Sequence, residues 1–393
     1  MTRFSEAIIT RVRVQGFRSL LDVNVELKDV TVLVGPNGSG KSSFVDALSF
    51  LHQCLTASPQ EAFKSRGGVE EVRTRTGQPA DVLALETSIR SRAEGLFSGT
   101  YFVRFNLTSR AEFSIAEESC EVSLTPEEGL RRFEVRHGRW VKAAEGAEPQ
   151  LAKNRLALPL LSGIRAFAPI YNALTAMRFY AITPGAVSTP SEPGEGEQLA
   201  EDGSNAASVL KSLEEKDETL STNVVQALSQ VVPSVSRIIP KYRGRRHVTL
   251  TFEEALSEEQ SVTFNAISMS AGTLRVLGIL LAIYQAEPPT LIGLEEPETA
   301  IHPGAAAGLA EALQEAGLRS QILVTTHSPD LVTRFEVDSL RAVERKRGLT
   351  VIAPISEAQR ASIIEGLFTA GELHRIEGLR PIASPSEGIS DHA

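Results

Sequence analysis

The sequence is short of the residues that build secreted and membrane proteins. Only two of its 393 residues are cysteine, Cys54 and Cys120, which is too few for a disulfide framework and favours the reducing cytoplasm. The start, Met1 to Thr10, lacks the unbroken apolar core of a signal peptide. The most apolar run, Val276–Ile283, is about half as long as a membrane span must be. We therefore expect a soluble, cytoplasmic protein that has no membrane partner.

Positive charge and repeats are also scarce. The chain has 40 lysines and arginines against 49 aspartates and glutamates, which leaves a net charge of −9 and argues against a protein that coats nucleic acid over its whole surface. A local basic groove is still compatible with this charge, because partners respond to local fields. No fixed-period repeat and no long heptad region occurs, so a solenoid is excluded and any coiled-coil arm is absent or short.

What is present is an alternation of strand and helix patterns that predicts an α/β protein. Three β-like runs, a glycine-rich turn and an amphipathic helix open the chain, at 8–14, 23–27, 30–34, 35–40 and 41–55. Between Asp81 and Trp140, period-two patterns at 83–87, 101–105 and 133–135 then predict an antiparallel meander. We assign residues 1–150 to an N-terminal lobe that contains the glycine-rich turn and this meander.

Two further lobes are expected after residue 150. Residues 151–265 are predicted to form a helical, lid-like insertion with a mobile loop at 183–203, and residues 266–380 a C-terminal lobe, followed by a disordered tail at 381–393. In the insertion, the helical stretch 156–177 should be interrupted at Pro159 and Pro169. The remaining expected elements are strands at 178–182, 247–252, 261–266, 290–294, 321–325 and 340–343, and helices at 206–213, 220–231 and 272–285.

The glycine-rich turn matches a phosphate-binding loop. Gly35-Pro36-Asn37-Gly38-Ser39-Gly40-Lys41-Ser42 fits G-x-x-x-x-G-K-[ST], with Ser43 next in the helix. Glycines let backbone N–H groups and the helix N-terminus face an anion. Lys41 then brings a charge to the β- and γ-phosphates of ATP, and the Ser42 hydroxyl is a ligand for Mg²⁺. A strand before and a helix after the turn distinguish it from a glycine turn with a chance lysine.

Two predicted strands end in residues suited to hydrolysis. Glu295 and Glu296 close the apolar run that starts at Thr290; Glu295 is a candidate Mg²⁺ ligand and Glu296 a candidate general base for the attacking water. His327 closes the run Ile322–Thr326 and can hydrogen-bond the γ-phosphate or that water. Either group alone is also common at an ordinary strand end.

A fourth segment, Ser268–Arg275, opens a helix. Ser270 and Gly272 place a hydroxyl and bare N–H groups at its N-terminus, which is either a second anion site or an ordinary capped helix. A second phosphate site in one chain is most simply explained if it closes over ATP bound by another copy.

In this order, the four elements resemble the nucleotide-binding head of the ABC ATPases. The closer resemblance is to the branch of RecF, the structural-maintenance-of-chromosomes (SMC) proteins and the overcoming-lysogenisation-defect (OLD) ATPases, including stand-alone predicted AAA-family ATPases. Val14-Gln-Gly-Phe-Arg-Ser-Leu20 is similar to the opening strand of that branch, whose turn, here Arg18 and Ser19, lies on the adenine side of the site. Glu295 to Pro303 is similar to its Walker B and D-loop segment, and Ser270 to Arg275 to its short signature motif.

The resemblance extends from about Ile9 to Leu379 and implies a homodimer that sandwiches two ATP molecules. Each site would combine the loop, Glu295, Glu296 and His327 of one copy with Ser270 and Gly272 of the other, so that hydrolysis switches the assembly. Two features depart from the pattern. Glu295 replaces the usual aspartate, and none of Gln53, Gln60 and Gln78 has the context of a Q-loop glutamine. OLD proteins carry a nuclease module; the chain ends too soon after His327 to include one, so a nuclease would be a separate partner.

Three functions remain open at this point. The first is an ATPase linked to DNA maintenance or anti-phage defence, supported by the basic segment Lys241-Tyr-Arg-Gly-Arg-Arg246, which can bind phosphates or simply protect a strand edge. The second is a regulatory or scaffold protein that binds ATP with little turnover. The third is a transporter ATPase subunit, against which the short signature with Thr273 and the Phe-Arg-Ser opening both count.

Overall fold

The computed structural model describes residues 6–76, 80–93, 95–108, 112–124, 129–143, 148–194, 198–244, 246–255 and 260–382. These residues form two compact units, one from Arg178 to Phe335 and the other from Glu6–Met177 together with the segment that begins at Glu336. This division differs from the three consecutive lobes that we expected, because late strands pair with an early one: β15 (Leu340–Lys346) lies parallel to β3 (Val30–Val34). Most of the expected tail at 381–393, and residues 195–197 of the expected mobile loop, lie outside the described residues.

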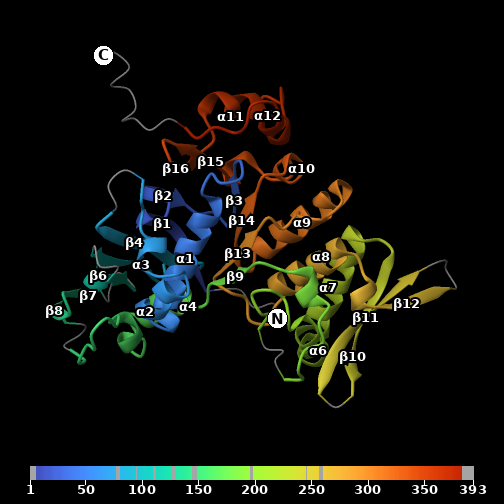
Figure 1. Cartoon of the computed structure of the whole chain (residues 1–393), viewed down its shortest axis with the longest axis horizontal. Coiled ribbons are helices and arrows are strands. Elements are labelled where there is room, and N and C mark those ends of the chain that lie inside the picture. Colours follow the sequence, from blue (N-terminus) through green and yellow to red (C-terminus); the bar gives the residue numbers. More distant parts are fainter. Residues whose placement is uncertain are drawn as a thin grey trace. The chain divides into compact units, whose positions relative to one another are not determined.

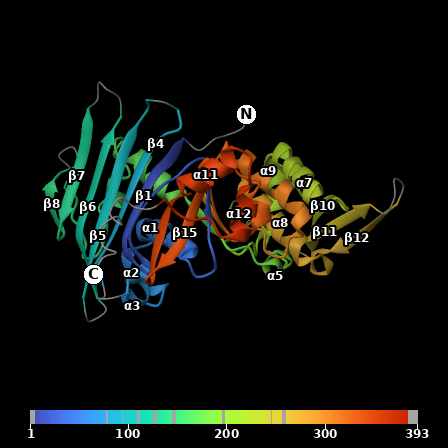
Figure 2. The same cartoon turned by 90° about the horizontal axis from the view of Figure 1, so that it is seen from above.

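The discontinuous unit contains a seven-stranded antiparallel sheet (Figure 2). Its strand order is β2-β1-β4-β5-β6-β7-β8, with bounds β1 Ala7–Phe17, β2 Leu20–Glu26, β4 Val82–Ser91, β5 Ser98–Leu107, β6 Phe113–Ser123, β7 Leu130–Arg136 and β8 Arg139–Lys142. The predicted meander is therefore confirmed. The sequence pattern missed β6 because Glu118, which points inward and is 1% exposed, takes a position where an apolar residue is expected.

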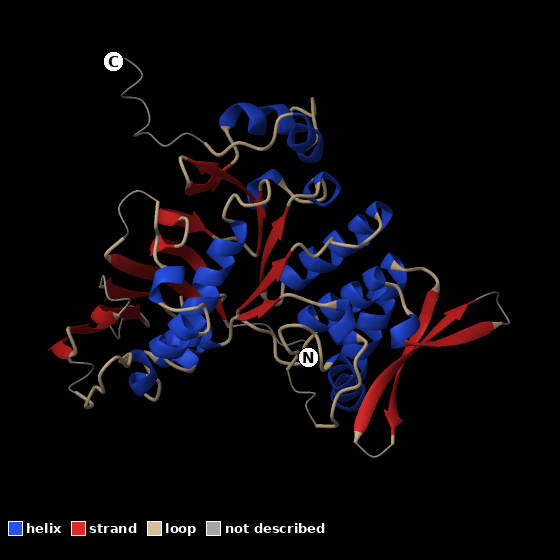
Figure 3. Cartoon of the chain, viewed as in Figure 1, coloured by secondary structure: helices blue, strands red, loops and turns tan. Residues whose placement is uncertain are grey.

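Helices of the same unit lie against this sheet (Figure 3). They are α1 (Lys41–Thr56), α2 (Pro59–Lys64), α3 (Val69–Val72), the 3₁₀ turn η1 (Leu158–Leu161) and α4 (Ala168–Thr175). Phe50 of α1 packs edge-on against Phe17, Phe63 and Phe105, and such pairs stabilise beyond the area that they bury. We predicted one helical stretch interrupted at Pro159 and Pro169. Instead, each proline lies in the first turn of a separate short helix, where proline is tolerated.

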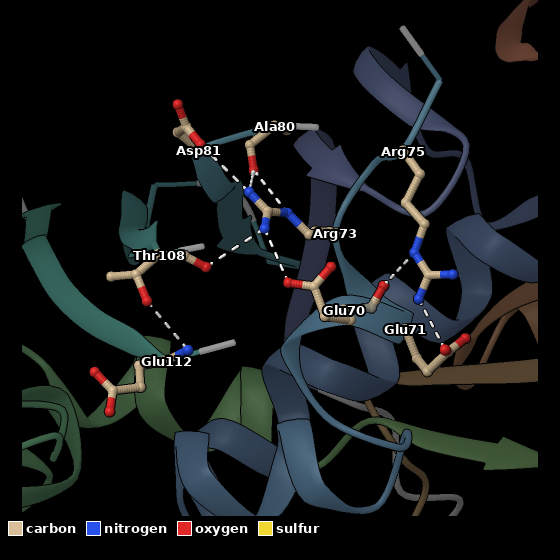
Figure 4. Close-up of polar contacts among 8 residues, drawn as sticks. All are labelled: Glu70, Glu71, Arg73, Arg75, Ala80, Asp81, Thr108 and Glu112. Atoms are coloured by element: carbon tan, nitrogen blue, oxygen red, sulfur yellow. Dashed lines mark hydrogen bonds and ion pairs between the residues drawn. The ribbon is translucent and has the colours of Figure 1, made fainter. Parts of the chain in front are cut away.

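Arg73 links the end of α3 to the segment just before β4 (Figure 4). Its side chain is 5% exposed and donates hydrogen bonds to the carbonyl of Ala80 at 2.9 Å and to the carboxylate of Glu70 at 3.0 Å. The preceding residue, Val72, accepts a 2.6 Å hydrogen bond from the backbone N–H of Arg18. The buried guanidinium therefore helps to hold the turn after β1 in place.

The unit is completed by β3, β15 and β16 (Leu349–Pro354), by the turn η4 (Val337–Ser339), and by α11 (Glu357–Ile364) and α12 (Ala370–Ile376). β15 pairs in parallel with β3 and antiparallel with β16. The hairpin between β15 and β16 turns through Arg347 and Gly348, both with positive φ.

The continuous unit is built on three parallel strands, β9 (Arg178–Tyr180), β13 (Leu291–Glu295) and β14 (Gln321–Thr326). Its helices are α5 (Pro184–Val187), α6 (Ala206–Lys216), α7 (Glu218–Val231), α8 (Ala271–Ile283), α9 (Ala306–Gly317) and α10 (Pro329–Val332), with turns η2 (Ala266–Ser268) and η3 (Pro303–Ala305). All predicted strands and helices of this segment are present. Among the described residues, no helix has both the length and the apolar character needed to cross a membrane.

A separate antiparallel sheet of three strands belongs to the same unit (Figure 1). It consists of β10 (Val235–Arg243), β11 (His247–Ala255) and β12 (Ser261–Asn265). The sequence predicted β11 and β12 but not β10, because β10 is largely polar and contains Pro240, which is uncommon within a strand. Mixed and antiparallel sheets flanked by helices confirm the predicted α/β fold class.

Candidate functional site

The phosphate-binding loop lies between β3 and α1, as predicted. Gly38 and Gly40 have φ angles of 76° and 107°, which side chains rarely adopt. Gly40 is the N-cap of α1 and offers no side chain to cap it. The first N–H groups of a helix need partners from outside the helix, so this end of α1 is suited to an anion.

Lys41 is held inside the loop. Its side chain is 4% exposed, and its ammonium group donates hydrogen bonds to the carbonyls of Gly35 at 2.7 Å and Pro36 at 3.0 Å. Pro36, Asn37, Gly38 and Ser42 are exposed and Ser43 is half-buried. The loop thus presents its backbone outward while the lysine charge stays beneath it, compensated by two carbonyls.

Ser39 is the least satisfied residue of the loop. It is 2% exposed, and its hydroxyl oxygen has no hydrogen-bond partner among the described residues. A buried hydroxyl without a hydrogen-bond partner is costly, so it calls for a partner that the described part of the chain does not supply. Together with the uncapped start of α1, it indicates that the loop is shaped for a bound ligand.

Thr350 of β16 supports the loop from outside the motif. Its hydroxyl donates to the carbonyl of Ser39 at 2.8 Å and hydrogen-bonds the hydroxyl of Ser19 at 2.7 Å. A side chain at Gly40 would lie 2.0 Å from the Thr350 hydroxyl oxygen, so this glycine is required by the contact. The sequence pattern offered no signal for Thr350, because nothing near it resembles a motif and it follows Ser39 by 311 positions.

Arg18 and Ser19, predicted on the adenine side, lie beside the same loop. Arg18 adopts a positive φ of 48° and forms a 2.7 Å ion pair with Asp46 of α1, while Ser19 reaches the loop through Thr350. Their contact with nucleotide stays a prediction. Arg345 also reaches the loop, donating a 3.4 Å hydrogen bond to the Gly38 carbonyl.

Of the three glutamines considered for a Q-loop, the two in the described part of the chain lie on helices and gain no support for that role. Gln53 lies on α1 and accepts hydrogen bonds from Arg66 at 2.7 Å and Ser65 at 2.9 Å. Gln60 is exposed on α2, and Gln78 lies outside the described residues.

In the continuous unit, Glu295, Glu296 and His327 lie at the carboxyl ends of the neighbouring parallel strands β13 and β14. Nδ1 of His327 is 3.2 Å from Oε1 of Glu296. Glu296 has a positive φ of 42°, an uncommon conformation for glutamate that costs about 1–3 kcal/mol. Its N–H donates to the carbonyl of Thr325 at 3.0 Å, which holds the strained residue in place.

Glu298 belongs to this cluster although the sequence did not single it out. Its carboxylate accepts a hydrogen bond from the hydroxyl of Thr326, and its other oxygen is buried with no hydrogen-bond partner among the described residues. Burial raises the pKa of Glu298 above its ordinary value, and the Thr326 hydroxyl opposes that rise. Glu298 is therefore linked to β14 at Thr326, the residue before His327.

Ser270 is the N-cap of α8. Its hydroxyl accepts a 3.1 Å hydrogen bond from the N–H of Thr273, so the capping role is present, and a role toward ATP stays a prediction. Gly272 lies against the turn that follows Glu298, where a side chain would come 2.5 Å from the carbonyl oxygen of Ala300. A surface cavity of about 480 Å³ adjoins these residues and is also lined by Val232, Pro233, Ile301 and His302.

The structure thus brings the predicted residues together in two groups. The loop lies with Arg18 and Ser19 in one unit; Glu295, Glu296 and His327 lie together in the other, which also contains Ser270 and Gly272. Among the described residues there is no cluster of three or more His, Cys, Asp or Glu side chains that could hold a metal. Mg²⁺ does not require one, since it takes few protein ligands beside water and substrate phosphates.

Comparisons with known proteins show the family and the fold of the chain. A family model described as "AAA domain, putative AbiEii toxin, Type IV TA system" matches residues 30–333, a range that includes both the loop and His327. The chain is 22% identical over 380 residues to "Old nuclease" of Escherichia phage P2, covering 89% of this chain and 61% of that relative. It therefore spans about three fifths of the relative's length.

Two solved structures have a similar fold. One is an SMC head bound to the C-winged helix domain of ScpA, with a TM-score of 0.57, 14% identity, and coverage of 90% of this chain and 99% of that one. The other is the SMC head domain with an extended coiled coil, bound to the C-terminal domain of ScpA, from Pyrococcus furiosus, with a TM-score of 0.54, 14% identity and coverage of 92% and 99%. At this identity the likeness concerns the fold alone.

Proposed function

The chain belongs to the AAA-domain family whose model spans residues 30–333, as a P-loop ATPase of the RecF, SMC and OLD type, and we propose that it hydrolyses ATP in a Mg²⁺-dependent manner. The observation that carries this proposal is the 3.2 Å contact between Glu296 and His327 at the ends of two parallel strands. A carboxylate paired with an imidazole can orient a water molecule and accept its proton.

In this proposal the loop binds the phosphates. Backbone N–H groups of the loop and of the first turn of α1 hydrogen-bond the anion, and Lys41 leaves its two carbonyl partners for the phosphate oxygens. Ser42 and Glu295 would hold Mg²⁺, which neutralises charge on the phosphates. Glu296 accepts the proton of the attacking water, while His327 keeps the Glu296 carboxylate in position.

We further propose that the active form is a homodimer. Ser270 and Gly272 begin a helix of 13 residues, and Ser270 is exposed, so this helix end can meet an anion on another molecule. Binding of ATP then closes the dimer and hydrolysis opens it, which makes the protein a switch. A nucleotide-dependent scaffold with little turnover is the alternative outcome of the same experiment.

Replacing Glu296 with Gln should test both proposals. Glutamine keeps the shape but cannot accept a proton, so ATP turnover should fall about a hundredfold or more while ATP binding persists. ATP should then shift the variant from monomer to a lasting dimer, measured by light scattering after size exclusion.

A second substitution supplies the control. Aspartate caps a helix as well as serine does, so E296Q/S270D should stay folded but repel the phosphate and fail to form the trapped dimer. Parental ATP turnover in E296Q would refute the assignment of Glu296, and an ATP-dependent dimer in the double variant would refute the role of Ser270.

For the pathway, we propose a link to nucleic acid in DNA maintenance or anti-phage defence, with a separate effector such as a nuclease. One support is that the relative from Escherichia phage P2 is named a nuclease and is longer than the part that this chain matches. The other is the basic turn of the β10–β11 hairpin. Tyr242, Arg243 and Arg246 are exposed there, and Arg245 lies outside the described residues. Basic side chains around an exposed aromatic ring suit a phosphate backbone with unstacked bases.

A further inference from the structure

We propose that Glu298 is a positioning residue for ATP hydrolysis, which holds the backbone around His327 through the hydroxyl of Thr326. This inference rests on the proposed function, because it concerns the residue pair assigned there to the attacking water. Glu298 itself is not placed in contact with ATP.

The hydrogen bonds around Thr326 form a chain in which each group donates to the next. Its hydroxyl oxygen accepts a 2.9 Å hydrogen bond from the backbone N–H of Ser328 and donates its single proton to the carboxylate of Glu298. A hydroxyl can do both at once, since it has one proton and two lone pairs. His327 is the residue between Thr326 and Ser328. The hydrogen bonds from the Ser328 N–H to the Thr326 hydroxyl, and from that hydroxyl to the Glu298 carboxylate, therefore fix the backbone on both sides of His327.

The partial burial of Glu298 argues against an incidental surface carboxylate. One of its oxygens is buried and has no hydrogen-bond partner in the described part of the chain. A buried, unpartnered carboxylate oxygen destabilises the fold. An apolar residue would avoid that cost but could not accept the Thr326 proton, so the carboxylate fits a task at this position rather than core packing.

The backbone of Glu298 provides a second link, toward the start of α8. Its carbonyl accepts a 3.0 Å hydrogen bond from the N–H of Ile301, which closes a turn through Ala300 at a positive φ of 65°. Gly272 packs directly on that turn. Glu298 therefore joins, within one residue, the backbone that carries His327 and the turn beside the Ser270 helix.

The experiment compares pairs of variants in the full-length chain. E298A and T326V each remove the link, whereas E298Q and T326S each keep an acceptor or a hydroxyl. Glu311, exposed on α9, serves as the control with E311A. For each protein we would measure the ATP dissociation constant, the single-turnover hydrolysis rate, the melting temperature, and hydrogen exchange of the Ser328 amide.

We expect E298A and T326V to slow hydrolysis about tenfold to a hundredfold, because a small displacement of catalytic groups has effects of this size. ATP affinity should stay within about twofold of the parent, since the loop that binds the phosphates is unchanged. Exchange of the Ser328 amide should rise about tenfold in both variants. E298Q, T326S and E311A should remain within about threefold of the parent, and E298A/T326V should be no slower than either single variant.

Several results would overturn the inference. Parental hydrolysis and Ser328 exchange in E298A would do so, as would multiplicative effects in the double variant, or a loss of ATP binding equal to the loss of rate. If E298A does not fold, the contrast between T326V and T326S decides the question. A parental chain whose ATP turnover equals that of K41A would instead refute the proposed function, while the exchange data would still report whether Glu298 holds the His327 backbone.

Discussion

At the residue scale, the phosphate-binding loop depends on side chains that no motif contains. The eight residues from Gly35 to Ser42 define its backbone, yet Thr350 holds the Ser39 carbonyl and leaves no space for a side chain at Gly40. Thr350 is 4% exposed, so losing its hydroxyl would leave a buried carbonyl without its donor. The same holds for Glu298, which acts on His327 only through a neighbour.

Replacing Thr350 with Val should therefore weaken ATP binding about three- to tenfold, because the freed Ser39 carbonyl costs on the order of 1–2 kcal/mol. T350S keeps the hydroxyl and should bind ATP as the parent does. Isothermal titration calorimetry measures both, with T263V on the exposed strand β12 as the control. Equal weakening in T350S and T350V would mean that packing of the Thr350 methyl group, rather than its hydroxyl, supports the loop.

At the scale of elements, many helices and strands follow from local pattern, and two of the strands that the pattern missed have a physical reason. β6 carries the buried Glu118, and β10 is polar with a proline, so neither shows the expected alternation. The buried carboxylate of Glu118 in β6 has a structural role. It accepts hydrogen bonds from the N–H groups of Ala157 at 2.6 Å and Leu158 at 2.9 Å and from the hydroxyl of Tyr101 at 3.0 Å, which ties the start of η1 to the sheet.

This glutamate should make stability depend on pH. Burial raises the pKa of Glu118 to about 7 from an ordinary 4.5, against the opposing hydrogen bonds. A raised folded-state pKa means that the folded protein binds the proton more tightly than the unfolded chain does. The stabilisation is thus complete below about pH 4.5 and is lost as the pH rises through 7, by up to about 3 kcal/mol.

Urea unfolding between pH 4.5 and 8 measures this contribution. In E118Q the group cannot titrate, so the difference in free energy of unfolding between parent and variant should change across this window. E112Q, which alters an exposed glutamate near the start of β6, should leave the difference flat. A parent-minus-E118Q difference that stays constant with pH would show that Glu118 does not titrate there.

At the scale of the whole molecule, the net charge of −9 disfavours contact with nucleic acid, whereas the basic turn of the β10–β11 hairpin favours it. Screening at physiological salt limits each charge to about 8 Å, so the local turn rather than the total charge decides contact with a phosphate backbone. The two-unit organisation is the other feature of this scale: the loop belongs to one unit, and Glu296 and His327, which we propose for hydrolysis, belong to the other.

If the basic turn binds DNA, R243E/R246E should weaken binding of a short DNA duplex or single strand about tenfold or more and reduce the salt dependence of binding by about one to two phosphate contacts. Fluorescence anisotropy at several salt concentrations measures both quantities. R139E changes an exposed arginine on β8 and should have no effect. DNA affinity that is the same in all three proteins would remove the structural support for the nucleic-acid proposal.

The sequence alone determined the phosphate-binding loop, the strands that end in Glu296 and His327, and the α/β class, because each depends on residues that are close along the chain. Glycines at set spacing and apolar runs act locally, so their pattern can be read before folding. Only the tertiary structure decided that Thr350 supports Ser39, that Glu298 holds Thr326, and that Glu118 joins β6 to η1. It also decided the division into two units, which follows from β15 pairing with β3. These contacts join residues far apart in the chain, and no local pattern records a partner that only folding brings near.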